Sequence, residues 1–447
     1  RDQPRSRGLG DVYKRQNNGD SQLPEKNKRT SAQRKRIKRT QQTGSAQGEA
    51  TVLRPQRGFK RLNNTDIFTR GGMDIPLFAL TVVILSIGLV MLFSASYPYS
   101  YFKYDNSYKF FLKQLIFAVV GIAAMLFVSK LNYKIFQGTA KFWLILTLFL
   151  LVLVLFYHTN VATDEGENFK RYIQIPGLFQ FQPSDVAKFT LTIVLASYIS
   201  TYHKWMGTMK YGILYPGAIV AVYCLLIFAE NHMSGAIIVG VIGLTLMFAG
   251  GSNKKIFAVG LALVVAAVVV VLVFPEILPN YVQRKLIAFT DKDYQPRGAR
   301  WQTNNSLYAI GSGGLFGRGL GNSKQKYLYV SQPQNDFIFS IVCEELGFVG
   351  AMAILLLFAA LVIRGFYIAT KIKDSFASLT VIGIMTQLGV QVALNVLVIT
   401  DSIPNTGIAL PFFSYGGTAL VMQLFEIGVV LAISRKANLR KADTEDV

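Results

Sequence analysis

Ten stretches of this chain are apolar almost without interruption, and this pattern constrains the fold more than any other feature. They are residues 76–96, 111–129, 142–158, 184–201, 212–229, 234–250, 255–274, 337–363, 377–399 and 417–434. Each is close to the roughly 20 residues that a helix needs to cross about 30 Å of hydrocarbon. A spanning segment must satisfy its own backbone hydrogen bonds in lipid, so these segments are expected to be helices. The pattern predicts an all-α integral membrane protein with about ten transmembrane helices.

The distribution of positive charge predicts the orientation, because cytoplasmic loops are enriched in Lys and Arg. With the N-terminus inside, each short inner loop is basic and nearly free of acidic residues. The basic residues of these loops are Lys130, Lys134, Lys141, His203, Lys204, Lys210, Lys254, Lys255, Arg364, Lys371 and Lys373. We therefore predict a multi-pass protein with both termini in the cytoplasm.

This orientation places three longer loops on the extracytoplasmic side. They are residues 159–183, 275–336 and 400–416. The second, between spans 7 and 8, has roughly sixty residues, and structureless loops of that length are usually functional. The active site is therefore expected on the extracytoplasmic side of the membrane.

The chain divides by composition into a membrane domain, residues 71–435, and two tails. Residues 1–70 hold 18 Lys or Arg against 6 Asp or Glu and lack apolar periodicity, which predicts a disordered cytoplasmic tail. The basic run 34–39 is interpreted as contacting anionic lipid rather than nucleic acid, because membrane spans follow it. Residues 1–16 resemble a translated adapter, and residues 436–447 form a second cytoplasmic tail.

Cysteine and histidine are too sparse for a metal site or a disulfide framework. The chain has two Cys, at 224 and 343, and three His that lie far apart in sequence. The glycine-rich residues 311–321 lack a Walker pattern, so a nucleotide-binding loop is not expected. We predict no bound metal from the protein's own ligands.

Unusual strings occur in the predicted outer loops and at the starts of the spans that follow them. They are residues 169–173 (FKRYI), 181–188 (FQPSDVAK), 312–323 (SGGLFGRGLGNS), 335–339 (NDFIF), 344–347 (EELG) and 410–418 (LPFFSYGGT). Together, in this order and on this topology, they resemble the shape, elongation, division and sporulation (SEDS) family, which includes FtsW, RodA and SpoVE. The resemblance covers roughly residues 73–435.

The resemblance implies a peptidoglycan glycosyltransferase of the bacterial cytoplasmic (inner) membrane that polymerises lipid II. The implied partners are a class B penicillin-binding protein, other division or elongation proteins and membrane lipid, with no nucleic acid. The implied reaction requires no organic cofactor, and a divalent cation such as Mg²⁺ is the candidate ion. The tail and residues 319–323 favour the division or sporulation type.

The sequence departs from the family pattern at several positions. Residues 231–236 (NHMSGA) lack the usual acidic residue, and residues 331–337 (SQPQNDF) replace a string that commonly reads PEAHTDF. Asp185 stands where Glu is usual, and Asp401 stands where Gly is usual. These departures leave the polymerase interpretation standing.

Asp336 is the candidate general base. It lies where the long outer loop enters the eighth span, at the membrane surface where lipid headgroups lie. The alternative is a structural role, because Asp is a favoured N-cap residue. The resemblance favours catalysis, since Asp336 matches the essential aspartate of the family.

Basic residues in the outer loops are candidate contacts for the substrate's pyrophosphate and sugars. Asp185 and Lys188 are three residues apart and share a helix face, so they form either a structural ion pair or a substrate site. Lys170 and Arg171 precede them in the first outer loop. The long loop contributes Arg297, Arg300, Arg318, Lys324 and Lys326, for which the alternative is a solvated basic surface.

Further residues are predicted to shape the interior. Glu344 and Glu345 lie about two helical turns after Asp336, and at least one must point inward or pair. Glu426 is expected to be structural, and Glu230 is left open. The predicted break before the last span contains Pro411, Ser414, Gly416 and Gly417, where irregular backbone is tolerated if it lines a cavity.

Two other functions are compatible with this topology. A lipid II flippase would need no outer carboxylate and should depend on inner charges. A non-catalytic division scaffold that recruits a transpeptidase would tolerate Asp336→Ala.

Overall fold

The computed structural model describes most of the membrane domain. The described residues are 67–69, 71–157, 161–162, 168–169, 172–174, 180–255, 257–260, 262, 276, 280–294, 298 and 300–445. Most of the predicted N-terminal tail, most of the seventh predicted span, Lys170, Arg171 and Arg297 lie outside these residues.

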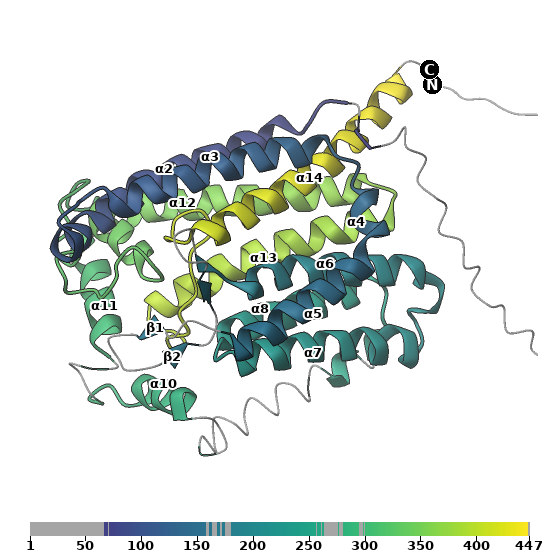
Figure 1. Cartoon of the computed structure of the whole chain (residues 1–447). Coiled ribbons are helices and arrows are strands. Elements are labelled where there is room, and N and C mark those ends of the chain that lie inside the picture. The colour runs from purple at the N-terminus through teal and green to yellow at the C-terminus, as the bar shows by residue number, and fades with distance from the viewer. Residues whose placement is uncertain are drawn as a thin grey trace, which may run out of the picture. The chain divides into compact units, whose positions relative to one another are not determined.

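Nine of the ten predicted spans coincide with helices, which run side by side in Figure 1. These helices are α2 (Ile75–Tyr104), α3 (Lys109–Lys130), α5 (Ala140–Phe156), α6 (Pro183–Thr201), α7 (Tyr215–Ala229), α8 (Met233–Ala249), α12 (Ile338–Lys371), α13 (Ser375–Ile399) and α14 (Gly417–Glu445). Six helical segments, one of them α7 with the turn before it, are long and apolar enough to cross a membrane, and α5 and α8 are shorter apolar helices. The described chain is thus a helical membrane protein, and the count of ten spans stays a prediction.

The helices α13 and α14 form the inside of the bundle. Their most apolar windows are 61% and 67% buried within the protein, whereas the corresponding windows of the other four segments are at most 39% buried. The helix α13 packs against α6, α8, α12 and α14, and α14 packs against α3. Side chains on α6, α13 and α14 therefore meet in the interior.

One end of the bundle is fastened by polar contacts between helix ends. Asp74 caps α2 by accepting from the amide of Leu77, and its carboxylate binds the Arg364 guanidinium of α12 at 2.7 Å. At the same end, Arg435 of α14 donates to the carbonyls of Ser129 and Gly71. These contacts fix α2, α3, α12 and α14 against one another at the end that carries the basic loops.

The loops at the opposite end contain structure that the sequence analysis did not predict. Within this region, β1 (Val161–Ala162) pairs with β2 (Asn168–Phe169), and β3 (Ile173–Gln174) pairs with β4 (Gln180–Phe181), both antiparallel. The long loop contains two helices, α10 (Asn280–Thr290) and α11 (Trp301–Gly313). Because α11 packs against α12, this part of the loop is joined to the bundle.

The helix α12 is broken at Gly347, which has φ 69° and ψ −172°. The backbone of residues 313–319 lies in the break, and its hydrogen bonds replace those that the helix loses there. The amides of Phe348 and Val349 donate to the carbonyls of Gly314 and Leu315, and the amides of Arg318 and Gly319 donate to the carbonyls of Glu344 and Glu345. The second part, residues 348–371, has 24 residues and could cross the membrane alone. The first part, residues 338–346, is thus a separate half-helix that begins beside Asp336.

Candidate active site

Asp336 lies two residues before α12 and is partly exposed. The N-cap of the helix is Phe337, without a side-chain cap, so the alternative that Asp336 is a helix cap is wrong. Among the described residues, no hydrogen bond or ion pair is recorded for the Asp336 carboxylate. The carboxylate is therefore placed at a helix start with its oxygens available to an incoming group.

Two elements hold the backbone around Asp336. Asn395, in the last turn of α13, donates from Nδ2 to the carbonyls of Asp336 and Ile408, each at 2.7 Å. A Cβ added to Gly407 would lie 3.3 Å from Asp336 Oδ2, so the loop that follows α13 approaches the carboxylate closely. This loop and α13 thus fix the position of the candidate base.

The residues before α14 form an ordered wall beside Asp336. The amide of Tyr415 donates to the carbonyl of Gln334 at 2.8 Å, and the Tyr415 ring packs edge-on against Phe110 at 4.8 Å. Burial, and to a lesser extent Tyr104, raises the pKa of Tyr415 above its ordinary value near 10. The phenol stays protonated at neutral pH, so it can donate a hydrogen bond but cannot act as the base.

Of the four residues predicted to break the chain before the last span, Pro411 and Ser414 are buried. Ser414 Oγ accepts from the amide of Leu410, and Gln114 of α3 bonds to the carbonyl of Ser414 and the amide of Gly416. A Cβ on Gly417 would lie 2.3 Å from the ring of Phe117. The irregular backbone is thus built into the packing of α3 against α14.

Asp185 and Lys188 form the predicted ion pair at 2.8 Å and are both buried in the first two turns of α6. Glu426 of α14 is fully buried, accepts two hydrogen bonds from Gln387 Nε2, and interacts electrostatically with Lys188 and Asp185. Charged side chains inside a membrane are costly and usually functional. The structure therefore joins two predicted residues to Glu426, which the sequence analysis treated separately.

Three buried amides along one face of α13 link this charged cluster to Asp336. Gln387, Gln391 and Asn395 are spaced by four residues, and each has a buried amide oxygen without a hydrogen-bond partner among the described residues. Eight residues of helix rise about 12 Å. The sequence analysis missed these residues, although their spacing within an apolar span was a detectable signal.

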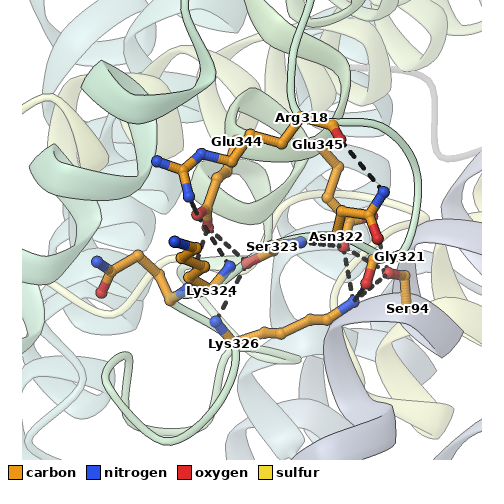
Figure 2. A network of polar contacts seen from close by, with 10 residues as sticks. Ser94, Arg318, Gly321, Asn322, Ser323, Lys324, Lys326, Glu344 and Glu345 are labelled. Atoms are coloured by element: carbon orange, nitrogen blue, oxygen red, sulfur yellow. Dashed lines mark hydrogen bonds and ion pairs between the residues drawn. The ribbon is translucent and has the colours of Figure 1, made fainter.

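Glu344 and Glu345 form the centre of a polar network that fastens the long loop to the bundle (Figure 2). Lys326 Nζ binds Glu345 at 2.8 Å and donates to Ser94 of α2, and all three side chains are buried. Glu344 accepts from the amides of Lys324 and Gln325 and from Ser323 Oγ, and Arg318 lies 3.8 Å away. Both glutamates therefore point inward and pair, and Lys326 is committed to this network.

Arg300 and Lys324 differ in their surroundings. Arg300 is buried, binds Asp401 at 2.7 Å and donates to the carbonyl of Ala288 in α10. Asp401 has φ 52°, a left-handed conformation that favours glycine and explains why Gly is usual at this position. Lys324 is exposed, and no bond to its ammonium group is recorded within the described ranges.

The arrangement brings together only some of the predicted substrate residues. Asp336 and the charged cluster are joined through α13, whereas Arg300, Arg318 and Lys326 each face a carboxylate of their own. Lys170 and Arg171 lie outside the described residues. The geometry suits a reaction in which one carboxylate accepts a proton at the end of the bundle.

The fold and the site define a class of protein. It is a polytopic helical membrane protein with ionisable side chains in its interior and, just before one helix, a carboxylate without a recorded partner among the described residues. A family model described as "Cell cycle protein", of the FtsW, RodA and SpoVE type, matches residues 75–439. The chain belongs to this family.

Curated relatives and solved structures agree with this assignment. The chain is 36% identical over 363 residues to stage V sporulation protein E of Bacillus subtilis, and the alignment covers 81% of this chain and 97% of that protein. It is 33% identical over 365 residues to the probable peptidoglycan glycosyltransferase FtsW of Geobacter sp. strain M18, covering 82% and 97%. Rod shape determining protein RodA of Thermus thermophilus aligns with TM-score 0.58 and 25% identity over 81% of this chain and 97% of that chain. A chain of a solved peptidoglycan synthase complex aligns with TM-score 0.65 and 24% identity, covering 82% and 98%.

Proposed function

We propose that this protein polymerises lipid II into peptidoglycan strands. The observation that carries the proposal is the position of Asp336, whose carboxylate lies just before α12 and has no recorded partner among the described residues. The chain that presents it belongs to this family. Relatives that are named probable peptidoglycan glycosyltransferases match over about four fifths of the chain, which supports the same activity here.

In the proposed reaction the 4-hydroxyl of an acceptor sugar attacks the anomeric carbon of a lipid-linked donor. The new bond joins that oxygen to the anomeric carbon, and the bond from the carbon to the pyrophosphate breaks. Asp336 accepts the hydroxyl proton, and undecaprenyl pyrophosphate leaves. An α-linked donor and a β-linked product require one inversion, so one carboxylate suffices, in contrast to the two that retaining glycosidases use.

The developing charge on the pyrophosphate needs a positive partner. Arg300, Arg318 and Lys326 each face a carboxylate. Lys188 also pairs with Asp185, but it lies in the buried cluster inside the bundle and stays a candidate together with Lys324, which has no recorded carboxylate partner among the described residues. Asp185 would then serve this site by holding the Lys188 ammonium group in place.

A divalent cation such as Mg²⁺ would supply further positive charge. Buried oxygens of Gln334, Asn395 and Thr406 lack hydrogen-bond partners among the described residues, and all three belong to the segments around Asp336. Hard cations take oxygen ligands, and Mg²⁺ is commonly held by one or two carboxylates plus substrate phosphates. These oxygens, together with the phosphates of the substrate, would hold the ion, which leaves the Asp336 carboxylate to accept the proton.

The proposal includes an orientation and a partner. The basic end of the bundle would face the bacterial cytoplasm, and Asp336 would face outward, where a class B penicillin-binding protein would crosslink the new strand. The structural likeness to a chain of a peptidoglycan synthase complex supports this arrangement.

The test is polymerisation of lipid II by the purified protein, alone and with its class B partner, with product length resolved on a gel. Asp336→Asn keeps the size of the side chain but removes the base, and we expect it to abolish polymer. Asp293→Asn, an exposed carboxylate in the same long loop, is the matched control and should polymerise normally. Equal polymer from wild type and Asp336→Asn would exclude Asp336 as the base, and EDTA followed by Mg²⁺ in the same assay tests the cation.

A lipid II flippase is the second candidate, because the buried cluster of Asp185, Lys188 and Glu426 is typical of transport pathways. A scaffold without catalysis is the third. If neither the wild type nor Asp336→Asn polymerises lipid II, but both move a fluorescent lipid II across the membrane of vesicles, the flippase interpretation replaces the polymerase.

A further inference from the structure

His232 lies in the tight turn between α7 and α8, beside the start of α6. The turn is made by Glu230, Asn231 and His232, with Asn231 in the left-handed conformation at φ 59°. The imidazole is 8% exposed and packs against Gly235, where an added Cβ would lie 2.6 Å from Nδ1. The ring is thus held in one place by the first turn of α8.

The Nδ1 atom of His232 faces two side chains from α6 and its N-cap. It lies 3.0 Å from Ser184 Oγ and 3.3 Å from Gln182 Nε2, and Gln182 Nε2 also lies 2.9 Å from Ser184 Oγ. An amide nitrogen can only donate, so Nδ1 must accept. In this orientation of the Gln182 amide, the ring is neutral and carries its proton on Nε2.

These contacts act on the part of α6 that carries charge. Gln182 is the N-cap of α6 and makes no side-chain capping bond, so its amide is free to turn toward His232. Ser184 is directly followed by Asp185, whose carboxylate holds Lys188. A change in the His232 ring is therefore transmitted within one helical turn to the buried ion pair.

We propose that His232 is a positioning residue for the Asp185–Lys188 pair, and that its protonation lowers the rate of the reaction. The inference rests on the proposed polymerase function. A protonated ring presents N–H at Nδ1, which cannot accept from the Gln182 amide nitrogen, so this amide must turn and give up its present contacts with the ring and Ser184. It also places a second positive charge beside the carboxylate that holds Lys188, so the pair is loosened.

The charged groups around His232 come from three helices. Asp185 and Lys188 lie on α6, Glu230 follows α7 and is buried, and Glu426 of α14 interacts with the α6 pair. The helix α8, against which the ring packs, carries no ionisable side chain. Histidine is the side chain whose charge ordinarily changes between pH 5 and 8, so the proposal is tested over that range.

The experiment is the pH profile of lipid II polymerisation for wild type, His232→Asn and His232→Leu, from pH 5 to 8. Asparagine offers an amide oxygen as an acceptor for Ser184 and Gln182 but does not titrate there, whereas leucine offers no acceptor. We expect the wild-type kcat to fall about tenfold per pH unit on an acid limb. His232→Asn should keep at least half of the neutral rate and lose the limb, while His232→Leu should be slow at every pH.

The outcomes separate this inference from the proposed function. The same acid limb in wild type and His232→Asn would overturn the role of His232 while leaving the polymerase in place. Equal rates for His232→Leu and wild type at neutral pH would also overturn it. Thermal unfolding in detergent identifies variants that fail to fold, and loss of all polymer in wild type would instead contradict the polymerase.

Discussion

The salt bridge between Asp185 and Lys188 has two separable consequences, for folding and for activity. Both side chains are at least nine-tenths buried, and the carboxyl group of Glu426 lies near enough to interact with them. Breaking a buried pair is costly because it leaves one charge without compensation, whereas replacing both partners with apolar groups is often neutral. A structural pair and a substrate site therefore predict different results for the same substitutions.

We predict that Lys188→Met destabilises the protein by about 3–5 kcal/mol and abolishes polymerisation. The double variant Asp185→Leu with Lys188→Met should regain most of the stability but none of the activity, because the cation that faces the pyrophosphate is still missing. Thermal unfolding in detergent and the lipid II gel measure the two effects. A double variant that polymerises normally would show that the pair is only structural.

At the same scale, Lys326 and Glu345 provide the contrasting case. Their ion pair and the bond to Ser94 fasten the long loop to α2 (Figure 2). Because Lys326 already faces this carboxylate, Lys326→Met alone should lower the unfolding temperature, and adding Glu345→Gln should recover part of that loss. The polymerisation rate should fall in proportion to the fraction of folded protein. A loss of activity larger than the loss of folded protein would indicate that Lys326 contacts the substrate.

At the scale of elements, the break in α12 is the feature that the sequence analysis failed to predict. Residues 337–363 were read as one continuous span, because glycine is common in transmembrane helices and a single Gly347 carries no signal of a break. The break depends on hydrogen bonds from residues 313–319, about thirty positions earlier, and no local pattern encodes that contact. The apolar runs predicted the positions of the nine helices that match predicted spans within a few residues, except for the ends of α2, α12 and α14, but they did not predict α10 or α11.

We predict that Gly347→Ala disrupts the outer half of α12. The residue has φ 69°, and an added Cβ would lie 2.2 Å from the amide nitrogen of Gly317. Gly311→Ala in α11 is the matched control, because its Cβ meets nothing within 4 Å and alanine favours a helix. Gly347→Ala should lower the unfolding temperature and the polymerisation rate, while Gly311→Ala should change neither downward, and equal behaviour of the two would contradict the role of the break.

At the scale of the whole molecule, the site combines residues from distant parts of the sequence. Arg300 and Asp401 are 101 positions apart, and Glu426 meets an ion pair on α6. The sequence motifs identified Asp336, Asp185 and Lys188 as candidates, because only a few residue types can act as a general base or bind a pyrophosphate. Their partners Asn395, Gln387 and His232 required the packing of helices, which apolar periodicity does not specify.

We predict that Lys324 and Lys373 lie on opposite sides of the membrane. Both are exposed, and they lie at the loop end and the basic end of the bundle. In a background with Cys224 and Cys343 replaced by Ala, an impermeant maleimide added to intact cells should label Lys324→Cys but not Lys373→Cys. Permeabilised cells should label both, and the reverse pattern in intact cells would contradict the orientation.

The loop inserted into α12 also sets an order of assembly during synthesis. Residues 313–319 leave the ribosome before α12, so the backbone that fills the break is already made when the half-helix 338–346 emerges. The half-helix 338–346 then has carbonyls that only this segment satisfies. Until the two meet, Glu344 and Glu345 are two unpaired acids at the edge of the lipid, where such charges are unstable. A substitution that keeps residues 313–326 from this position would therefore leave both carboxylates without the partners that compensate their burial.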